Sequence, residues 1–262
     1  MIFILMPFMD VIRRSLFGAM SGKFVGFKNY STIFQNDAFK LAAMNTLKFT
    51  VICIPLLILS SLGLALLINQ LGKKAGLFKM TFLLPMAIPV ASVVLLWQVL
   101  FHQNGLLSKV IIALGGQGVD WMKTDWSFKI LILSYLWRNI GYDMVLWLAG
   151  LSTISPEVYE AARVDGANGW QQFAKITMPQ LLPTLFTIVV LSLLNSFKVF
   201  REAYLIAGDY PHDSMYMLQH LFNNWFVALD IDKLSAAATV VAGIIFILIL
   251  LLQKTWEEDT EE

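Results

Sequence analysis

Residues Phe49–Ile68 read FTVICIPLLILSSLGLALLI and contain no charged side chain. A helix rises about 1.5 Å per residue and the hydrocarbon core of a bilayer is about 30 Å thick, so this run is long enough to cross a membrane. Thr81–Phe101 and Leu234–Gln253 are similarly long and also uncharged. Because the edge amides of an open sheet would have no hydrogen-bond partner in lipid, the three stretches predict transmembrane helices.

Two further stretches, Ile130–Leu151 and Leu181–Ala207, are long and apolar but carry charged side chains. The first apolar segment, Met1–Met9, is too short to span and stops at Asp10. A cleaved signal peptide would have its basic residues before the apolar core, whereas here they follow it. We therefore expect an all-α membrane protein with about six transmembrane helices, the first of them short or incomplete.

These stretches give an expected domain organisation. We expect a short or incomplete first helix with an outer loop at 1–45, a transmembrane domain at 46–253, and an acidic tail at 254–262. Within the domain we expect helices at about 46–69, 77–101, 128–151, 182–207 and 234–253, with a long loop at 152–181.

The composition agrees with a membrane protein and excludes several other classes. Hydrophobic residues make up 58% of the 262 residues and charged residues 14%, against about 45–50% and 25% in soluble domains. A net charge of +1 argues against a nucleic-acid partner, which requires a basic stripe. Cys53 is the one cysteine, and the three histidines His102, His212 and His220 form no metal-binding spacing, so no metal site is expected.

The loop at 152–181 carries the strongest local signals. Ser155 is a good N-cap, and Pro156 suits the first helical position, where its missing N–H costs nothing. Glu157 then lies in the first turn, next to the positive helix end. Gly166 is expected to end this helix, because glycine adopts positive φ freely.

A second short helix is expected after Gly166. Trp170, Phe173 and Ile176 recur every three residues and give it an apolar stripe, and Pro179 and Pro183 are expected to break it before the next membrane helix. The first short helix would then present Glu160, Arg163 and Asp165 outward. An amphipathic loop lying in the lipid interface is the alternative, but it does not require Ala161, Ala162 or the tight turn at Gly166.

The same loop resembles a family motif. Glu160-Ala161-Ala162, three residues, Gly166, nine residues, and then Ile176-Thr177-Met178-Pro179 match E-A-A-x3-G-x9-I-x-L-P, except that Met178 replaces leucine. This pattern is typical of the cytoplasmic EAA loop of ABC importer permeases, and the longer stretch 159–167 resembles the sugar branch, which includes maltose and glycerol-phosphate permeases. Weaker resemblances lie at 24–30, 45–46, 83–89 and 119–121.

The resemblance implies a role for the loop. In such permeases it forms a coupling helix that inserts into a groove on a cytoplasmic ATPase, and the membrane bundle alternates between inward and outward openings. The residues implied in this coupling are Glu160, Ala161, Ala162, Arg163, Asp165, Gly166, Ile176 and Pro179. By resemblance, Glu160 pairs with a basic residue of the ATPase and Gly166 sets the turn between the two short helices.

The resemblance also implies partners and a location. The chain has no G-x-x-x-x-G-K-[ST] phosphate loop, so the ATP is expected to be used by a separate ATPase and no cofactor is expected here. The expected assembly is a heterodimer with a second permease, two ATPase subunits and an extracellular solute-binding protein, in a bacterial-type plasma membrane. The end of the chain soon after Gln253 favours the permease type that lacks a C-terminal extension.

Charged and polar residues inside the bundle are expected to face its interior, because an ionised side chain at mid-bilayer costs at least about 2.5–3.5 kcal/mol. The candidates for a translocation path are Arg138, Asn139, Asp143, Asn195, Lys198 and Glu202. Trp137, Tyr142 and Trp147 could stack on sugar faces. The alternative is that these charged groups pair with one another between helices.

Rival functions remain open at this point. An ABC permease for a non-sugar solute is the nearest alternative to carbohydrate import. A secondary transporter driven by an ion gradient would use the intramembrane charges, but the sequence shows no internal repeat and the EAA pattern would be unexplained. An intramembrane enzyme with Asp143 or His102 as catalyst lacks a paired acid and base.

Overall fold

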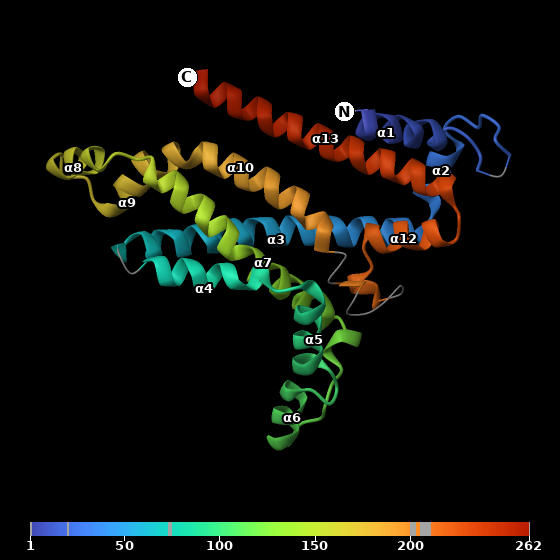
Figure 1. The fold of residues 1–262 in the computed structure, drawn as a ribbon, viewed down its shortest axis with the longest axis horizontal. Helices are drawn as coiled ribbons and strands as arrows, with labels where there is room; N and C mark the ends of the chain where they lie inside the picture. The colour runs from blue at the N-terminus through green and yellow to red at the C-terminus, as the bar shows by residue number, and fades with distance from the viewer. Residues whose placement is uncertain (1, 20, 73–74, 200–202, 205–210, 262) are drawn as a thin grey trace. The chain divides into compact units, whose positions relative to one another are not determined.

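The computed structural model describes residues 2–19, 21–72, 75–199, 203–204 and 211–261, and for residues 2, 4, 198 and 255–261 it describes the backbone alone. The described chain is helical apart from turns, loops and one isolated bridge between Phe17 and Phe24, which confirms the expected all-α fold (Figure 1). It forms two compact units. One consists of Met1–Lys48, Trp121–Phe128 and Ala203–Glu262, and the other of Phe49–Asp120 and Lys129–Glu202.

Helices account for most of the described residues in both units. In chain order they are α1 (Ile2–Ser15), α2 (Lys28–Gln35), α3 (Asp37–Asn69), α4 (Ala75–Ala87), α5 (Val90–Phe101), α6 (Leu106–Ala113), α7 (Trp126–Ser152), α8 (Pro156–Val164), α9 (Gly169–Gln172), α10 (Met178–Ser196), α12 (Leu218–Val227) and α13 (Ile231–Glu261). Short turns of other helix types lie at Trp121–Lys123, Phe173–Thr177, Phe197–Val199 and Asp213–Met215.

Four described helical segments are long and apolar enough to cross a bilayer: Asp37–Asn69, Val90–Ala113, Gly169–Ser196 and Ile231–Lys254. The 27-residue α7 is also long, but it carries Arg138 and Asp143. The uncharged run Phe49–Ile68 forms most of α3, as its length and composition predict.

The helix boundaries differ from the expected ones at several places. Helix α3 begins at Asp37 rather than near residue 46, and the span expected at 77–101 is divided at Ile88 and Pro89. The division follows from chemistry, because proline lacks the N–H that a continuous helix needs and disfavours α geometry at the preceding residue. Helix α10 ends at Ser196 rather than near 207, and α13 continues to Glu261 through the expected tail.

The unit that holds the loop at 152–181 has an apolar core shared by α3, α7 and α10. Trp147, Leu181 and Ile188 are completely buried in it. The indole N–H of Trp147 donates to the Ser61 hydroxyl at 3.0 Å. This hydrogen bond ties α7 to α3 and satisfies the polar atom of the buried ring, as buried polar groups require.

Glycines allow two close helix approaches in the same unit. A Cβ placed on Gly141 of α7 would collide with the carbonyl oxygen of Phe82 in α4, and one placed on Gly150 would collide with the Thr184 side chain of α10. Small residues let the backbones of membrane helices approach closely, and the resulting contacts stabilise the pair. The position of α7 against α4 therefore depends on the absence of a side chain at Gly141.

The other unit has its own core, formed by α2, α12, α13 and the first part of α3. Phe39 and Trp225 stack there with ring centroids 6.4 Å apart. Asn45 is buried and donates to the carbonyl oxygens of Asp213 and Tyr216, at 2.6 and 3.0 Å. Asn45 is thus a packing residue of this unit.

Candidate functional site

The first short helix of the coupling loop, α8, begins as its sequence predicts. The hydroxyl of the N-cap Ser155 accepts the Glu157 N–H at 3.3 Å, and Pro156 occupies the first turn. No residue of α8 is buried. A nine-residue helix with no buried residue gains little from its own packing, because helix stability in proteins comes mostly from tertiary contacts.

The charged side chains of α8 are available at the surface. Glu160 and Arg163 are exposed, and so is Asp165 immediately after the helix, while Ala162 is half-buried. The helix ends at Val164, and Gly166, two residues later, has a φ of +81°, in the left-handed region that glycine adopts without strain. The predicted turn at Gly166 is therefore present, and it directs the chain into α9.

The second short helix continues into the membrane helix, contrary to expectation. Asn168 and Gln171 form a capping box that starts α9. A π-turn at Phe173–Thr177 then joins α9 to α10, and in it the Met178 N–H donates to the Phe173 carbonyl, five residues back. Neither Pro179, in the first turn of α10, nor Pro183 interrupts the helix. Proline lacks the N–H donor that a regular helix uses, and the wide turn before Pro179 accommodates this missing donor.

The predicted apolar stripe of this segment has two parts. Phe173 and Ile176 pack against the core of their unit, whereas Trp170 is 73% exposed and only tilts against Phe173, with ring centroids 5.7 Å apart. An exposed tryptophan of this size is unusual unless it lies at an interface. Ile176 thus ties the coupling loop to the unit core, and Trp170 projects away from it.

One contact in this region has no signal in the sequence. The Tyr159 hydroxyl lies 2.8 Å from the Thr177 hydroxyl, which is buried in the π-turn. Thr177 Oγ1 also lies 3.4 Å from the Gln172 carbonyl oxygen. The Tyr159–Thr177 hydrogen bond thus connects α8 to the residue that precedes α10.

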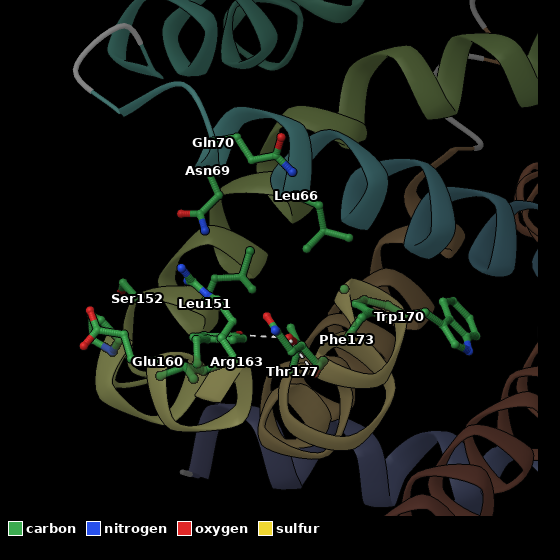
Figure 2. Close-up of a pocket in the computed structure, with 15 residues that line it drawn as sticks. Leu66, Asn69, Gln70, Leu151, Ser152, Glu160, Arg163, Trp170, Phe173 and Thr177 are labelled. Atoms are coloured by element: carbon green, nitrogen blue, oxygen red, sulfur yellow. Dashed lines mark hydrogen bonds between the residues drawn. The ribbon is translucent and has the colours of Figure 1, made fainter. Parts of the chain in front are cut away.

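A cavity of about 770 Å³ lies between α8, α9 and the ends of α3 and α7 (Figure 2). Leu66 and Leu151 line one part of it, and Glu160 and Arg163 of α8 line another, as Figure 2 shows. The cavity separates α8 from the membrane helices over part of its length. Helix α8 therefore borders the cavity, and its Tyr159 hydroxyl bonds to Thr177.

The interior of the bundle contains a buried carboxylate. Asp143 of α7 is only 2% exposed, and its Oδ2 accepts a hydrogen bond from the Ser192 hydroxyl of α10 at 3.1 Å. The Tyr135 hydroxyl donates to the backbone carbonyl of the same Ser192 at 3.2 Å. Two side chains of α7 thus converge on one residue of α10, which the sequence did not indicate.

The other path candidates lie on α7, on α10 and in the residues after α10. Asn139 is partly buried and donates to the Tyr135 carbonyl of its own helix at 2.8 Å. Arg138 and Asn195 are partly buried. The Lys198 side chain and Glu202 lie outside the described residues. Trp147 packs in the core and bonds to Ser61, so the suggestion that it stacks on a sugar is wrong.

Among the residues that the structure describes, no three His, Cys, Asp or Glu side chains are placed to hold a metal ion.

Comparisons with known proteins agree with one another. A family model described as "Binding-protein-dependent transport system inner membrane component" matches residues 61–256. The sulfoquinovosyl glycerol permease protein SmoG of Agrobacterium fabrum is 31% identical, over 87% of this chain and 75% of its own. The lactose permease protein LacF of Rhizobium radiobacter is 28% identical, over 95% and 86%. The trehalose/maltose permease protein MalF of Thermococcus litoralis is 27% identical, over 86% and 79%.

Solved structures show the same fold. A bacterial ABC transporter that imports the acidic polysaccharide alginate superposes with a TM-score of 0.86 at 24% identity, covering 98% of this chain and 90% of its own. A second structure, the alginate transporter in complex with an alginate pentasaccharide-bound periplasmic protein, has a TM-score of 0.82 at 24% identity, covering 96% and 87%.

Proposed function

The chain belongs to the inner membrane components of binding-protein-dependent transport systems, the permease subunits of ABC importers, and from this premise we propose that it imports a carbohydrate. It is a multi-pass membrane protein and a transport subunit, and the ATP is used by a partner ATPase rather than by a cofactor site in this chain. The single observation that supports energy coupling through this chain is the exposed, Gly166-terminated helix α8.

The proposed solute class rests on the relatives and on the loop motif. The names of the relatives refer to sulfoquinovosyl glycerol, lactose and trehalose or maltose, and the stretch 159–167 has the form found in sugar permeases. Trp137 and Tyr142 are partly buried on α7, the helix that carries Asp143, and aromatic rings of this kind stack on the apolar faces of sugars. Uptake of labelled carbohydrates and labelled amino acids by cells expressing the full complex tests the class. Uptake of amino acids alone would overturn the solute class and leave the family intact.

The coupling role is proposed for Glu160, Ala161, Ala162, Arg163, Asp165, Gly166, Ile176 and Pro179 together. Glu160 and Arg163 offer charge to an ATPase groove, and the small Ala161 and Ala162 let another backbone approach. Ile176 packs against the unit core, so a force on α8 reaches α10 through the turn and the π-helical segment. A path role is proposed for Asp143 with Arg138, Asn139, Asn195, Lys198 and Glu202, Asp143 being the member with a defined contact between helices.

The proposed complex contains a second permease, two ATPase subunits and an extracellular solute-binding protein. In this proposed complex helix α8 contacts the ATPase, and the loop at 152–181 accordingly lies in the cytoplasm. The alginate transporter, which shares the fold, has been seen with a solute-loaded periplasmic protein. We propose the corresponding partners for this chain.

A matched pair of substitutions on α8 tests the coupling role. Glu157 and Glu160 are both exposed carboxylates of α8, three residues apart. Glu160→Gln is expected to lower ATPase co-purification and ATP-driven solute uptake together, because it removes the charge proposed to pair with the ATPase. Glu157→Gln removes an equal charge one turn away and should leave both near the wild-type level. Equal effects of the two substitutions would contradict the assignment of Glu160.

A further inference from the structure

A groove with charged walls lies where α1 ends and α13 begins. Its volume is about 490 Å³, and it belongs entirely to the unit that contains both helices, which pack alongside each other (Figure 1). Arg13 and Arg14 line one wall and Asp232 lines another. Gly18, Ala19 and Gly22 add little side-chain bulk to the lining, and Phe17, Leu229 and Ile231 supply its apolar part. A small polar group can therefore enter between the opposite charges.

The arginine wall is oriented and keeps free donors. Arg14 Nε donates to Asp10 Oδ2 at 2.6 Å, and Arg13 Nε lies 3.5 Å from Asp10 Oδ1. The Arg13 guanidinium also sits over the Phe17 ring, 5.9 Å from its centroid. Because both ion pairs use Nε, the terminal Nη groups stay available, and guanidinium forks match phosphate oxygens in geometry. One carboxylate and two guanidinium groups leave one net positive charge, which suits one phosphodiester.

The opposite wall carries a carboxylate with capacity to spare. Lys233 ion-pairs with Asp230 at 2.8 Å, rather than with Asp232. Asp232 accepts the backbone N–H of Lys233 through Oδ1, at 2.9 Å. A carboxylate offers about four acceptor positions on its two oxygens, so Asp232 can accept further N–H donors. The groove thus presents donors on one side and a negatively charged acceptor on the other.

The position of the arginines along α1 matches the headgroup layer of a bilayer. Helix α1 exposes large apolar side chains up to Met9, among them Phe3, which is 94% exposed, and Met9, which is 63% exposed. The charges then begin at Asp10, and Arg14 lies five residues beyond Met9, or about 7 Å along the helix axis. A headgroup layer is about 5–8 Å thick on each side of the hydrocarbon core. Acyl chains can therefore lie on α1 while the headgroup reaches the arginines.

We propose that this groove binds the zwitterionic headgroup of a bilayer phospholipid of the phosphatidylethanolamine type. The phosphodiester contacts Arg13 and Arg14, the primary ammonium contacts Asp232, and the acyl chains lie on the apolar face of α1. The primary amine is the specific element, because its N–H groups can donate to the carboxylate whereas a trimethylated amine cannot. The inference is independent of the solute and of the coupling role.

Native mass spectrometry of the purified transport complex, titrated with phosphatidylethanolamine and phosphatidylcholine, tests the site. The wild-type complex should bind phosphatidylethanolamine more tightly. Arg13→Gln with Arg14→Gln should weaken both lipids by about tenfold, the size expected for lost charge-assisted hydrogen bonds. Asp232→Asn should remove the preference for the primary amine and leave phosphatidylcholine binding unchanged. Lys23→Gln removes an exposed charge from the same loop outside the groove and should change neither.

Three results would overturn the proposal. One is equal binding of both lipids to the wild type and to Asp232→Asn. Another is lipid binding by the double arginine variant that equals that of Lys23→Gln. A third is loss of solute-binding-protein capture in the double variant with lipid binding unchanged, which would make the groove a protein contact. The Asp232→Asn result stands by itself if the double variant does not assemble.

Discussion

Gly141 lets α7 approach α4 closely, because a Cβ there would collide with the Phe82 carbonyl oxygen. Gly141→Ala should force the two backbones apart and destabilise the complex by about 1–3 kcal/mol, the range for overpacked sites. Thermal unfolding of the purified complex measures this. Gly63→Ala on α3 is the control, since no atom lies within 4 Å of a Cβ at that position. Equal unfolding temperatures for the two variants would contradict the close approach.

The Ser192 hydroxyl donates a hydrogen bond to the buried Asp143 carboxylate. Ser192→Ala should cost about 1–3 kcal/mol, because it leaves a buried polar group without this donor. Ser196→Ala is a matched control on the same helix, since the Ser196 hydroxyl is also buried but donates to the Leu193 carbonyl of its own helix. Denaturant unfolding of the complex should separate the two variants. An equal, small cost would show that the bond between α7 and α10 contributes nothing to stability.

The residues that could be predicted from the sequence are those whose role is local. Ser155 and Gly166 act on backbone groups within a few positions, so their residue types suffice to assign a cap and a turn. Ser192 and Gly141 act on another helix, and which helices meet depends on packing that a single sequence does not state. A serine or a glycine inside an apolar helix is a weak hint of such a contact.

At the scale of elements, α8 and α10 are joined by the Tyr159 and Thr177 hydroxyls. Tyr159→Phe should weaken this joint by about 1 kcal/mol, the usual net value of one hydrogen bond. We expect faster hydrogen exchange in α8 and less solute imported per ATP hydrolysed, with the ATPase still bound. Combining it with Thr177→Val should add little to the loss, because both changes remove the same bond. Additive effects on transport would show that the two residues act separately.

The elements themselves were predictable where their signal was a long uncharged run, and less so at prolines. Pro89 divides the span expected at 77–101 into α4 and α5, yet Pro179 and Pro183 leave α10 continuous. The difference at Pro179 lies in the π-turn before it, and a wide turn has no clear residue signature. Helix α3 begins earlier than its apolar run because Phe39 and Asn45 are buried in the other unit core. Tertiary packing, rather than membrane length, sets that boundary.

For the whole molecule, composition was enough to assign a membrane protein, since 58% apolar content exceeds what soluble domains carry. The family required the spacing of one loop, whose residues run from the surface of α8 through the turn at Gly166 to the first turn of α10. The solute has no comparable signal, because the contacts of a path form among side chains from several helices. The buried Asp143 illustrates this, since its partner Ser192 lies 49 residues away in the sequence.

The energy source is a property of the whole complex and separates an ABC importer from an ion-driven carrier. Helix α8 exposes its charges, as the proposed contact with an ATPase requires, whereas Asp143 is engaged with Ser192 inside the bundle. We expect proteoliposomes of the full complex to transport solute with ATP and without any ion gradient. They should do so only when ATP is on the α8 side and the loaded binding protein is on the other. A gradient alone should give no transport. Transport that follows the gradient and ignores ATP would contradict the coupling role of α8.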